Sequence, residues 1–299
     1  MKEIAYLTGA SWRGEALPEG ILPELEMRDY ARILPAAEAA GLKLVIVRWG
    51  DERAKSCAAA LIRSCWDYTE RREEFCAALE AIAQAGTPVF NPPALVRWNS
   101  QKTYLRDLAA AGVPCIATHW AQKTDPAFVA SAFEGLDCAQ LVLKPQIGAG
   151  SRNTPRLMRN AWSSSDLIDA PEGPVMAQAF LPAIETFGEV SLLYFGGKFS
   201  HAVRKVPPDG GWLANDRRAE ITAYMPDIAQ LELAAQALAA MPLAPLYARV
   251  DLVRDGQDSW ALIELEAIEP ALYLSHAEDG ARALCAAMAA ALSRIPRPL

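Results

Sequence analysis

Strand and helix patterns alternate along the first third of the chain. Apolar, β-rich runs stand at 4–9 (IAYLTG), 42–49 (LKLVIVRW), 59–64 (AALIRS) and 87–91 (TPVFN). Helical stretches around 28–40 and over 70–86 lie between them, and a glycine closes each one as a C-cap would. Apolar strands separated by helices are typical of a parallel sheet with helices on its faces. The pattern therefore predicts an N-terminal α/β domain over residues 1–95.

The pattern changes after this domain. Segment 99–112 (NSQKTYLRDLAAAG) is predicted to be a helix, with an Asn-Ser cap at its start and a glycine at its end. Three strand patterns (114–120, 140–146 and 174–180) then accompany one helical stretch (125–135). They indicate a small α+β unit, which we expect to form a central domain over 96–184.

Two hairpin signals mark the last part of the chain. Gly196-Gly197 and Asp255-Gly256 each separate two β-rich runs. Helical patterns cover 226–241 and 277–294. We expect a C-terminal domain with a mixed sheet over 185–299, so that the whole chain combines α/β and α+β architecture.

Composition narrows the class of protein. The chain has 299 residues, 52% hydrophobic and 22% charged, which is typical of a globular protein with two or three lobes. A net charge of -7 argues against binding nucleic acid or an anionic membrane through a broad basic face. Because no apolar run is long enough for a signal peptide or a spanning helix, we expect a cytoplasmic protein, and a homodimer is allowed. The six cysteines are scattered without metal-ligand spacing, so we expect buried thiols.

A glycine-rich loop follows one of the central strands in QLVLKPQIGAGSRNTP (140–155). Gly148 and Gly150 would let backbone N–H groups approach a polyphosphate, and Ser151 and its neighbours add donors. Lys144 would place a positive charge at the strand end. The spacing is not that of a Walker P-loop, and an ordinary flexible connection is the alternative.

Three acids lie in the last two strands. Glu264 and Glu266 are two residues apart, so they share a strand face, and pairing about Asp255-Gly256 can bring Asp251 beside them. Three carboxylates on one face repel each other, and Mg²⁺ carrying nucleotide phosphates would offset that repulsion. The alternative is a solvent-facing row of acids.

Cations and aromatic residues supply further candidates. Arg249 precedes Asp251 by two residues and is suited to bind a carboxylate or a phosphoryl group, and Arg204 lies on the strand after the first hairpin. The end of the third strand, where parallel sheets place ligands, carries Arg63, Trp66, Asp67 and Tyr68. A surface turn is the alternative for these four, and His201 is taken as structural rather than catalytic.

Together these motifs resemble the ATP-grasp superfamily. The resemblance covers roughly 63–274 and rests on RSCWDY, NPPALVRWNSQKTYLRDLAAAGVP, KPQIGAGSRNT, MAQAFLPAIETFGEVSL, HAVRKV, RVDLV and IELEAIEPALYL. It is closest to the branch with a prokaryotic glutathione-synthetase-like nucleotide domain. Within that branch, chain length and motif order most resemble the cyclo-ligases that form D-cycloserine from O-ureido-D-serine.

The resemblance implies a role for each matching residue. Lys102 and Lys144 would bind ATP phosphates beneath a lid formed by the 147–154 loop, with Gly148, Gly150 and Ser151. The adenine hinge would run from Gln178 through Phe180 to Leu181, and Glu185 or Glu189 would bind the ribose. Asp251, Glu264 and Glu266 match the metal-binding acids, although Glu266 stands where many relatives have asparagine. A solvated lysine at 102 and a core amide at 178 are the alternatives.

The resemblance also implies the chemistry. An ATP- and Mg²⁺-dependent ligase of this type would phosphorylate the carboxylate of a small amino acid, and a nitrogen of the same molecule would then displace phosphate. Arg249, Lys144 and Arg204 would stabilise the transition state, and the substrate would contact Arg63, Trp66, Asp67, Tyr68 and Arg204. The alternatives are an intermolecular acid–amine ligase and a non-catalytic nucleotide-binding protein.

Overall fold

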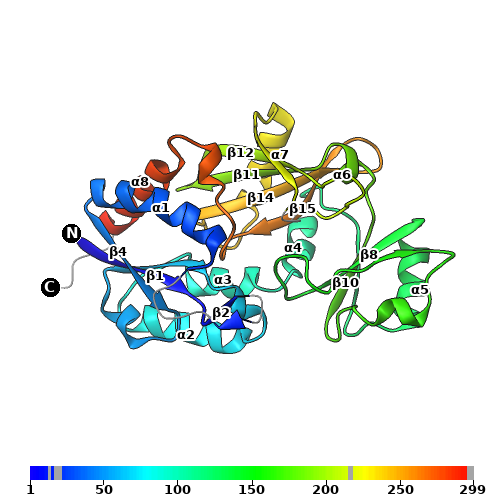
Figure 1. Cartoon of the computed structure of the whole chain (residues 1–299), viewed down its shortest axis with the longest axis horizontal. Coiled ribbons are helices and arrows are strands. Elements are labelled where there is room, and N and C mark those ends of the chain that lie inside the picture. Colours follow the sequence, from blue (N-terminus) through cyan, green and yellow to red (C-terminus); the bar gives the residue numbers. More distant parts are fainter. Residues whose placement is uncertain (13–14, 17–21, 215–217, 295–299) are drawn as a thin grey trace.

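The computed structural model describes residues 1–12, 15–16, 22–214 and 218–294. The structure has three larger sheets: the N-terminal sheet lies below the C-terminal sheet, and the central sheet lies at the right-hand end of the molecule (Figure 1). No helix in the described ranges has the length and apolar character needed to cross a membrane.

The N-terminal sheet is parallel, as predicted. Its strands lie in the order β4-β1-β5-β6. Their bounds are Lys2–Thr8 (β1), Leu42–Arg48 (β4), Ala59–Ser64 (β5) and Val89–Phe90 (β6). Helices α1 (Glu24–Ala39) and α2 (Arg72–Gln84) connect them, with short helices η1 (Glu52–Ser56) and η2 (Trp66–Thr69). A small ribbon of β2 (Ser11–Trp12) and β3 (Glu15–Ala16) follows β1.

The single helix predicted over 99–112 is wrong. Helix α3 (Pro93–Asn99) begins with proline at its first turn, and α4 (Tyr104–Ala110) starts five residues after α3 ends. The Asn99 side chain does not cap a helix. Its amide donates to Leu265 O and accepts from Ala267 N, which ties α3 to the distant C-terminal sheet.

The central sheet is antiparallel, in the order β7-β10-β8-β9. It comprises β7 (Thr118–Ala121), β8 (Gln140–Pro145), β9 (Arg156–Met158) and β10 (Val175–Ala179), with η3 (Ser164–Leu167). Helix α5 (Pro126–Gly135) covers it, and Asp125 caps the helix by accepting from Phe128 N. We call β7–β10 with α5 the lid unit. Its strand β7 begins later than predicted because Cys115 instead bridges to Leu262 in the next sheet.

The C-terminal sheet has the strand order β13-β12-β11-β14-β15. Every ladder between these strands is antiparallel, whereas a mixed sheet was predicted. The only parallel pairing described for this sheet is the bridge between Cys115 and Leu262. The strands are β11 (Glu189–Phe195), β12 (Lys198–Val206), β13 (Glu220–Tyr224), β14 (Tyr247–Arg254) and β15 (Trp260–Glu266). Both predicted hairpins are present. Helices α6 (Ala183–Thr186), α7 (Ile228–Ala239), η4 (Leu274–His276) and α8 (Gly280–Ser293) complete this part.

Hydrophobic cores show how the parts join. One core combines Ile4 and Leu61 of the N-terminal sheet with Leu193 of β11 and Leu284 of α8. Helices α1 and α8 lie side by side over this junction (Figure 1). A second core packs α3, α4 and α7 against β11, β14 and β15, so the segment from α3 to α4 packs with the C-terminal sheet. The lid unit has a core of its own.

The cysteines are free thiols. Four of them are buried as expected, whereas Cys115 and Cys138 are half-buried.

Candidate active site

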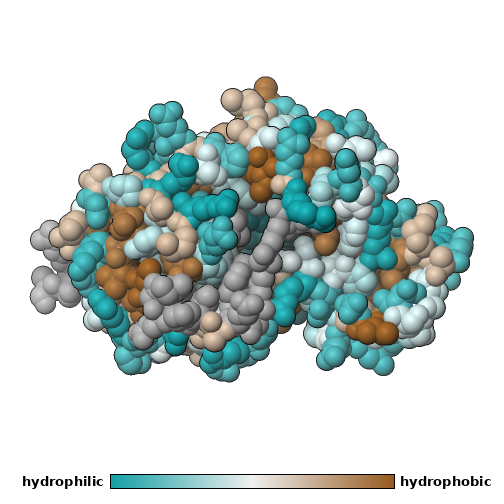
Figure 2. Space-filling view, in the orientation of Figure 1, coloured by the Kyte–Doolittle hydropathy of each residue, from teal (hydrophilic) through white to brown (hydrophobic). Residues whose placement is uncertain are grey.

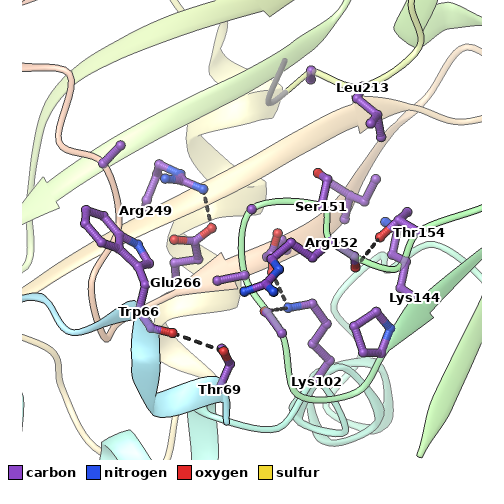
Figure 3. A pocket seen from close by; sticks show the side chains of 18 of the residues that line it. Trp66, Thr69, Lys102, Lys144, Ser151, Arg152, Thr154, Leu213, Arg249 and Glu266 are labelled. Carbon is purple, nitrogen blue, oxygen red and sulfur yellow. Dashed lines mark hydrogen bonds and ion pairs between the residues drawn. The ribbon is translucent and has the colours of Figure 1, made fainter. Parts of the chain in front are cut away.

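A cavity of about 760 Å³ lies where the three parts meet. Residues of η2, the turn before α4, strands β8 and β10, the loop after β8 and strand β15 line it. Figure 3 shows two regions of this cavity: Arg249, Glu266 and Trp66 lie together, and Lys102, Lys144, Arg152 and Thr154 lie around the glycine-rich loop. Hydrophilic residues cover most of the molecular face shown in Figure 2.

Two lysines reach the cavity beside the loop. Lys102 Nζ lies 2.7 Å from Glu264 Oε1 and donates to Gly148 O at 3.0 Å. Burial opposes charge on Lys102, but the neighbouring carboxylate of Glu264 outweighs it and raises the pKa of this lysine. Lys144 Nζ donates to the neutral Gln178 Oε1 at 2.9 Å, and burial lowers its pKa. Lys144 is half-buried, and among the described residues no carboxylate pairs with it directly.

The loop after β8 needs its glycines. Gly150 has φ +66°, a region that favours glycine, and Ser151 and Asn153 also adopt positive φ. A Cβ at Gly148 would lie 2.6 Å from Pro145 Cγ. These conformations turn Ser151, Arg152 and Thr154 toward the cavity.

The three predicted metal-binding acids meet. In the β14–β15 ladder Asp251 pairs with Glu264 and Arg249 pairs with Glu266. Carboxylate oxygens of Asp251, Glu264 and Glu266 all lie within 4.8 Å of one another. The alternative of a solvent-facing row is wrong, because Asp251 is buried and both glutamates line the cavity.

Arg249 balances two of these acids. It donates through Nε and Nη2 to Asp251 at 2.9 and 2.8 Å, and through Nη2 to Glu266. Burial raises the pKa of Asp251, but the stronger effects of Arg249 and Lys205 and a bond from Ser191 Oγ bring it down to about 2. The pKa of Glu266 is raised, because burial and the charges of Glu264 and Asp251 outweigh Arg249.

The other side of the cavity is apolar. Ile116, Val142, Leu181 and Ile263 line it together with Phe180. The Arg156 guanidinium lies 3.5 Å from the centre of the Phe180 ring and donates to Glu185 Oε1 at 2.6 Å. Gln178, beside this slot, is buried and bonded to Lys144 and Thr118, so it is a satisfied amide that also lines the cavity.

Two predicted substrate contacts lie elsewhere. Arg63 is fully buried, donates to Glu26 Oε1 and to Pro270 O at 2.9 Å each, and is absent from the cavity lining. Arg204 also lies off the lining, with its guanidinium 5.3 Å from the Phe187 ring centre. Side chains alternate across a strand, so Arg204 faces away from its neighbour Lys205, which pairs with Glu189.

The turn after β5 does reach the cavity. Trp66, Asp67 and Tyr68 line it. Both oxygens of Asp67 are already engaged, however: Oδ2 accepts from Ala10 N at 2.8 Å and Oδ1 from Trp49 Nε1 at 3.1 Å. Asp67 therefore fixes the wall of the cavity, and each of its oxygens already accepts a bond from the protein. Tyr68 is buried and stacks on Phe75.

The two candidates for the ribose differ in position. Glu189 lines the cavity, whereas Glu185 pairs with Arg156 and lies outside the lining. His201 is buried and bonded to Leu272 O and Ser200, which fits the structural interpretation.

Some residues of the site escaped the sequence analysis. Ser191 lies behind the acids and donates to Asp251, and it could have been found from the strand pairing that sets Ser191 opposite Asp251. Glu269 and Tyr273 line the cavity. Burial and the neighbouring Glu266 raise the pKa of Glu269 to about 8. Its only signal in the sequence is a third acid in IELEAIEP, and nothing there reveals its burial.

A lid unit and an antiparallel sheet that enclose lysines, a glycine-rich loop and three carboxylates define an ATP-grasp ligase. Known proteins are similar along nearly the whole chain. A family described as "D-cycloserine synthetase DcsG, N-terminal domain" matches residues 4–91. The cycloserine biosynthesis protein DcsG of Streptomyces lavendulae is 31% identical over 285 residues, covering 87% of this chain and 93% of that protein. The chain belongs to the DcsG family of ATP-grasp ligases.

Solved structures agree. The crystal structure of D-cycloserine synthetase DcsG has a TM-score of 0.81 at 29% identity, covering 97% of this chain and 99% of the other. D-alanine–D-alanine ligase from Bacillus anthracis has a TM-score of 0.70 at 13% identity, covering 98% and 97%, and shares the fold. The predicted ATP-grasp fold and ligase class are confirmed.

Proposed function

We propose that this ligase uses ATP to close O-ureido-D-serine into D-cycloserine, releasing ADP and phosphate. The observation that carries the proposal is one cavity in which two lysines and a glycine-rich loop face a group of three carboxylates, within a chain that is similar to DcsG over 87% of its length.

The nucleotide would lie across the lid unit and the C-terminal sheet. The apolar slot around Leu181 and Phe180 suits adenine, with hinge atoms from Gln178 onward as hydrogen-bonding partners. Glu189, which lines the cavity, is the better candidate for the ribose than Glu185. Lys102, Lys144 and the loop at Gly148, Gly150 and Ser151 would bind the phosphates.

The three acids suit Mg²⁺. Their donor set is oxygen only, and the cations Arg249 and Lys102 already hold them close together. Asp251, Glu264 and Glu266 would hold the metal, which supplies positive charge to the phosphoryl oxygens.

The protein would catalyse the reaction by positioning the reactants and by placing positive charge beside the groups that become negative. The substrate carboxylate attacks the γ-phosphorus of ATP, the bond to the bridging oxygen breaks, and ADP leaves. The nitrogen next to the ureido oxygen then attacks the acyl carbon, and phosphate leaves. The carbamoyl group on that nitrogen must also leave, because D-cycloserine does not contain it. Its hydrolysis consumes one water and gives carbon dioxide and ammonia, which balances the atoms. Arg249 and Lys144 would offset the developing negative charge.

Phosphate release tests this function. With Mg-ATP, the purified protein should release phosphate when O-ureido-D-serine is the sole other substrate, and mass spectrometry should show the five-membered ring. An Arg249→Lys variant should lose more turnover than ATP affinity, because an ammonium lacks the two-pronged guanidinium contact. Phosphate release that requires a second amino acid, with no cyclic product, would instead indicate an intermolecular ligase. Nucleotide binding with no release for any substrate would indicate a non-catalytic protein.

A further inference from the structure

Glu269 is a buried acid that faces the cavity without a partner. It follows β15, its residue is 5% exposed, and it lines the cavity. Within the described ranges it has no hydrogen bond or ion pair with the side chain or backbone of another residue.

The other buried acids of the described residues all have partners. Glu26 accepts from Tyr6 and Arg63, Asp29 from Leu272 N and Leu274 N, Asp67 from Ala10 N and Trp49, Glu189 from Lys205, and Asp251 from Ser191 and Arg249. Glu269 alone keeps both oxygens without a donor from another residue. Burial therefore disfavours the charged form of this carboxyl, which opens onto the cavity, and a cationic ligand would stabilise that form.

The position of Glu269 indicates the ligand. It stands three residues after Glu266 and lies outside the group of three acids that could hold a metal. Glu266 and Glu269 both line the cavity, and the charge of Glu266 helps to raise the pKa of the Glu269 carboxyl. In an amino-acid substrate the α-nitrogen is bonded to the carbon next to the carboxylate. A substrate whose carboxylate is activated beside Glu266 and Arg249 therefore has its α-nitrogen close to these two residues. Trp66 lies at this end of the cavity (Figure 3).

We propose that Glu269 binds the α-ammonium group of the amino-acid substrate. The inference rests on the proposed function, and it replaces Asp67 as the anion of the substrate site. The ammonium would supply the donor that Glu269 lacks, and the pair would fix which end of the substrate faces ATP.

Steady-state kinetics with Glu269→Gln tests the inference. The change keeps the shape and removes the charge, so the KM for O-ureido-D-serine should rise roughly 10- to 100-fold, the range for a hydrogen bond to a charged group. The KM for ATP should change less than about threefold, since nucleotide contacts remain. Glu269→Asp, which keeps the charge, should recover part of the loss. Glu232→Gln, the same change on the exposed face of α7, serves as control.

An analogue without the amino group gives a second readout. The wild type should use 3-(ureidooxy)propanoate far less well than O-ureido-D-serine, and Glu269→Gln should lose most of that discrimination. Thermal unfolding of ligand-free Glu269→Gln should not be lower than wild type, which separates a binding role from a structural one. If the wild type is active but the variant keeps its KM and its discrimination, the inference is overturned and the proposed function stands. If the wild type releases no phosphate with O-ureido-D-serine, the proposed function itself fails, and this inference with it.

Discussion

At the scale of single residues, the site is a set of buried charges held in balance. Arg249 pairs with Asp251 and Glu266, Lys102 with Glu264, and Lys205 with Glu189. Such pairs stabilise a fold weakly because desolvation offsets their attraction, but removing one partner leaves a costly buried charge. Among the described residues of the cavity, Lys144 has no ion pair, and Glu269 has no bond from another residue, so that burial and Glu266 raise its pKa.

Replacing Lys144 should affect catalysis more than folding. Lys144→Ala removes a half-buried cation that, among the described residues, bonds to a neutral amide and to no acid, so the free energy of unfolding without nucleotide should change by no more than about 1 kcal/mol. The kcat/KM for ATP should fall by a factor that corresponds to about 2–4 kcal/mol of lost transition-state stabilisation. Cations and hydrogen-bond donors in closed active sites commonly contribute this much. Phosphate-release kinetics measure this, with Lys198→Ala on the exposed end of β12 as control. Normal ATP turnover in Lys144→Ala would refute the phosphate-binding role.

At the scale of elements, strand pairing and close contacts decide what each motif does. The β14–β15 register aligns Asp251 with Glu264, and alternation along β12 sends Arg204 away from the site. The turn η2 is fixed in a similar way, because Asp67 binds the backbone of Ala10 immediately after Gly9.

Gly9 is required by this contact. A Cβ at position 9 would overlap the Asp67 carboxylate, whereas a Cβ at Gly50 would meet no atom within 4 Å. Gly9→Ala should therefore lower the free energy of unfolding by about 1–3 kcal/mol, and Gly50→Ala should stay within about 0.5 kcal/mol of wild type. Urea unfolding compares the two. Equal stability of both variants would show that the η2 turn can shift freely.

The contact between α1 and the loop after β15 should respond to pH. Asp29 accepts from Leu272 N and Leu274 N, and burial with the nearby Glu26, partly countered by Arg63, raises its pKa from 3.8 to about 6. The folded state thus binds the proton more tightly, so this contribution to stability is complete below pH 4 and is lost as pH rises through 6. Relative to Asp29→Asn, the wild type should lose about 3 kcal/mol between pH 4 and pH 7.

Urea unfolding at several pH values measures this difference. Asp169→Asn, an exposed acid outside the contact, serves as control and should leave the pH dependence unchanged. Parallel curves for wild type and Asp29→Asn would show that Asp29 keeps an ordinary pKa.

At the scale of the whole molecule, two hydrophobic cores are each built from segments that lie far apart in the sequence. The N-terminal sheet shares a core with β11 and α8, and α3 and α4 share another with the C-terminal sheet. The lid unit has its own core, and it also contributes Met176 of β10 to the core of the C-terminal sheet. The two larger parts should therefore unfold together.

Leu284 tests this coupling. It is fully buried in α8, so Leu284→Ala should lower the free energy of unfolding by about 2–5 kcal/mol through the cavity it leaves. Calorimetry should show the N-terminal and C-terminal parts still melting in one transition at a lower temperature. Arg282→Ala, on the exposed side of the same helix, should change little. Separate transitions for the two parts in Leu284→Ala would contradict the shared core.

The sequence by itself determined the local elements and the chemistry they carry. The parallel strands, the two hairpins and the grouping of Asp251, Glu264 and Glu266 follow from apolar periodicity and glycine positions, which act over a few residues. The tertiary structure decided which charges remain unpaired. Arg63 and Asp67 were expected at the substrate but are bound to Glu26 and to Ala10 and Trp49, whereas Glu269 gave no strong signal and faces the cavity. The burial of a charged side chain and the partners that it bonds depend on segments far apart in the chain, so a local sequence pattern cannot predict them.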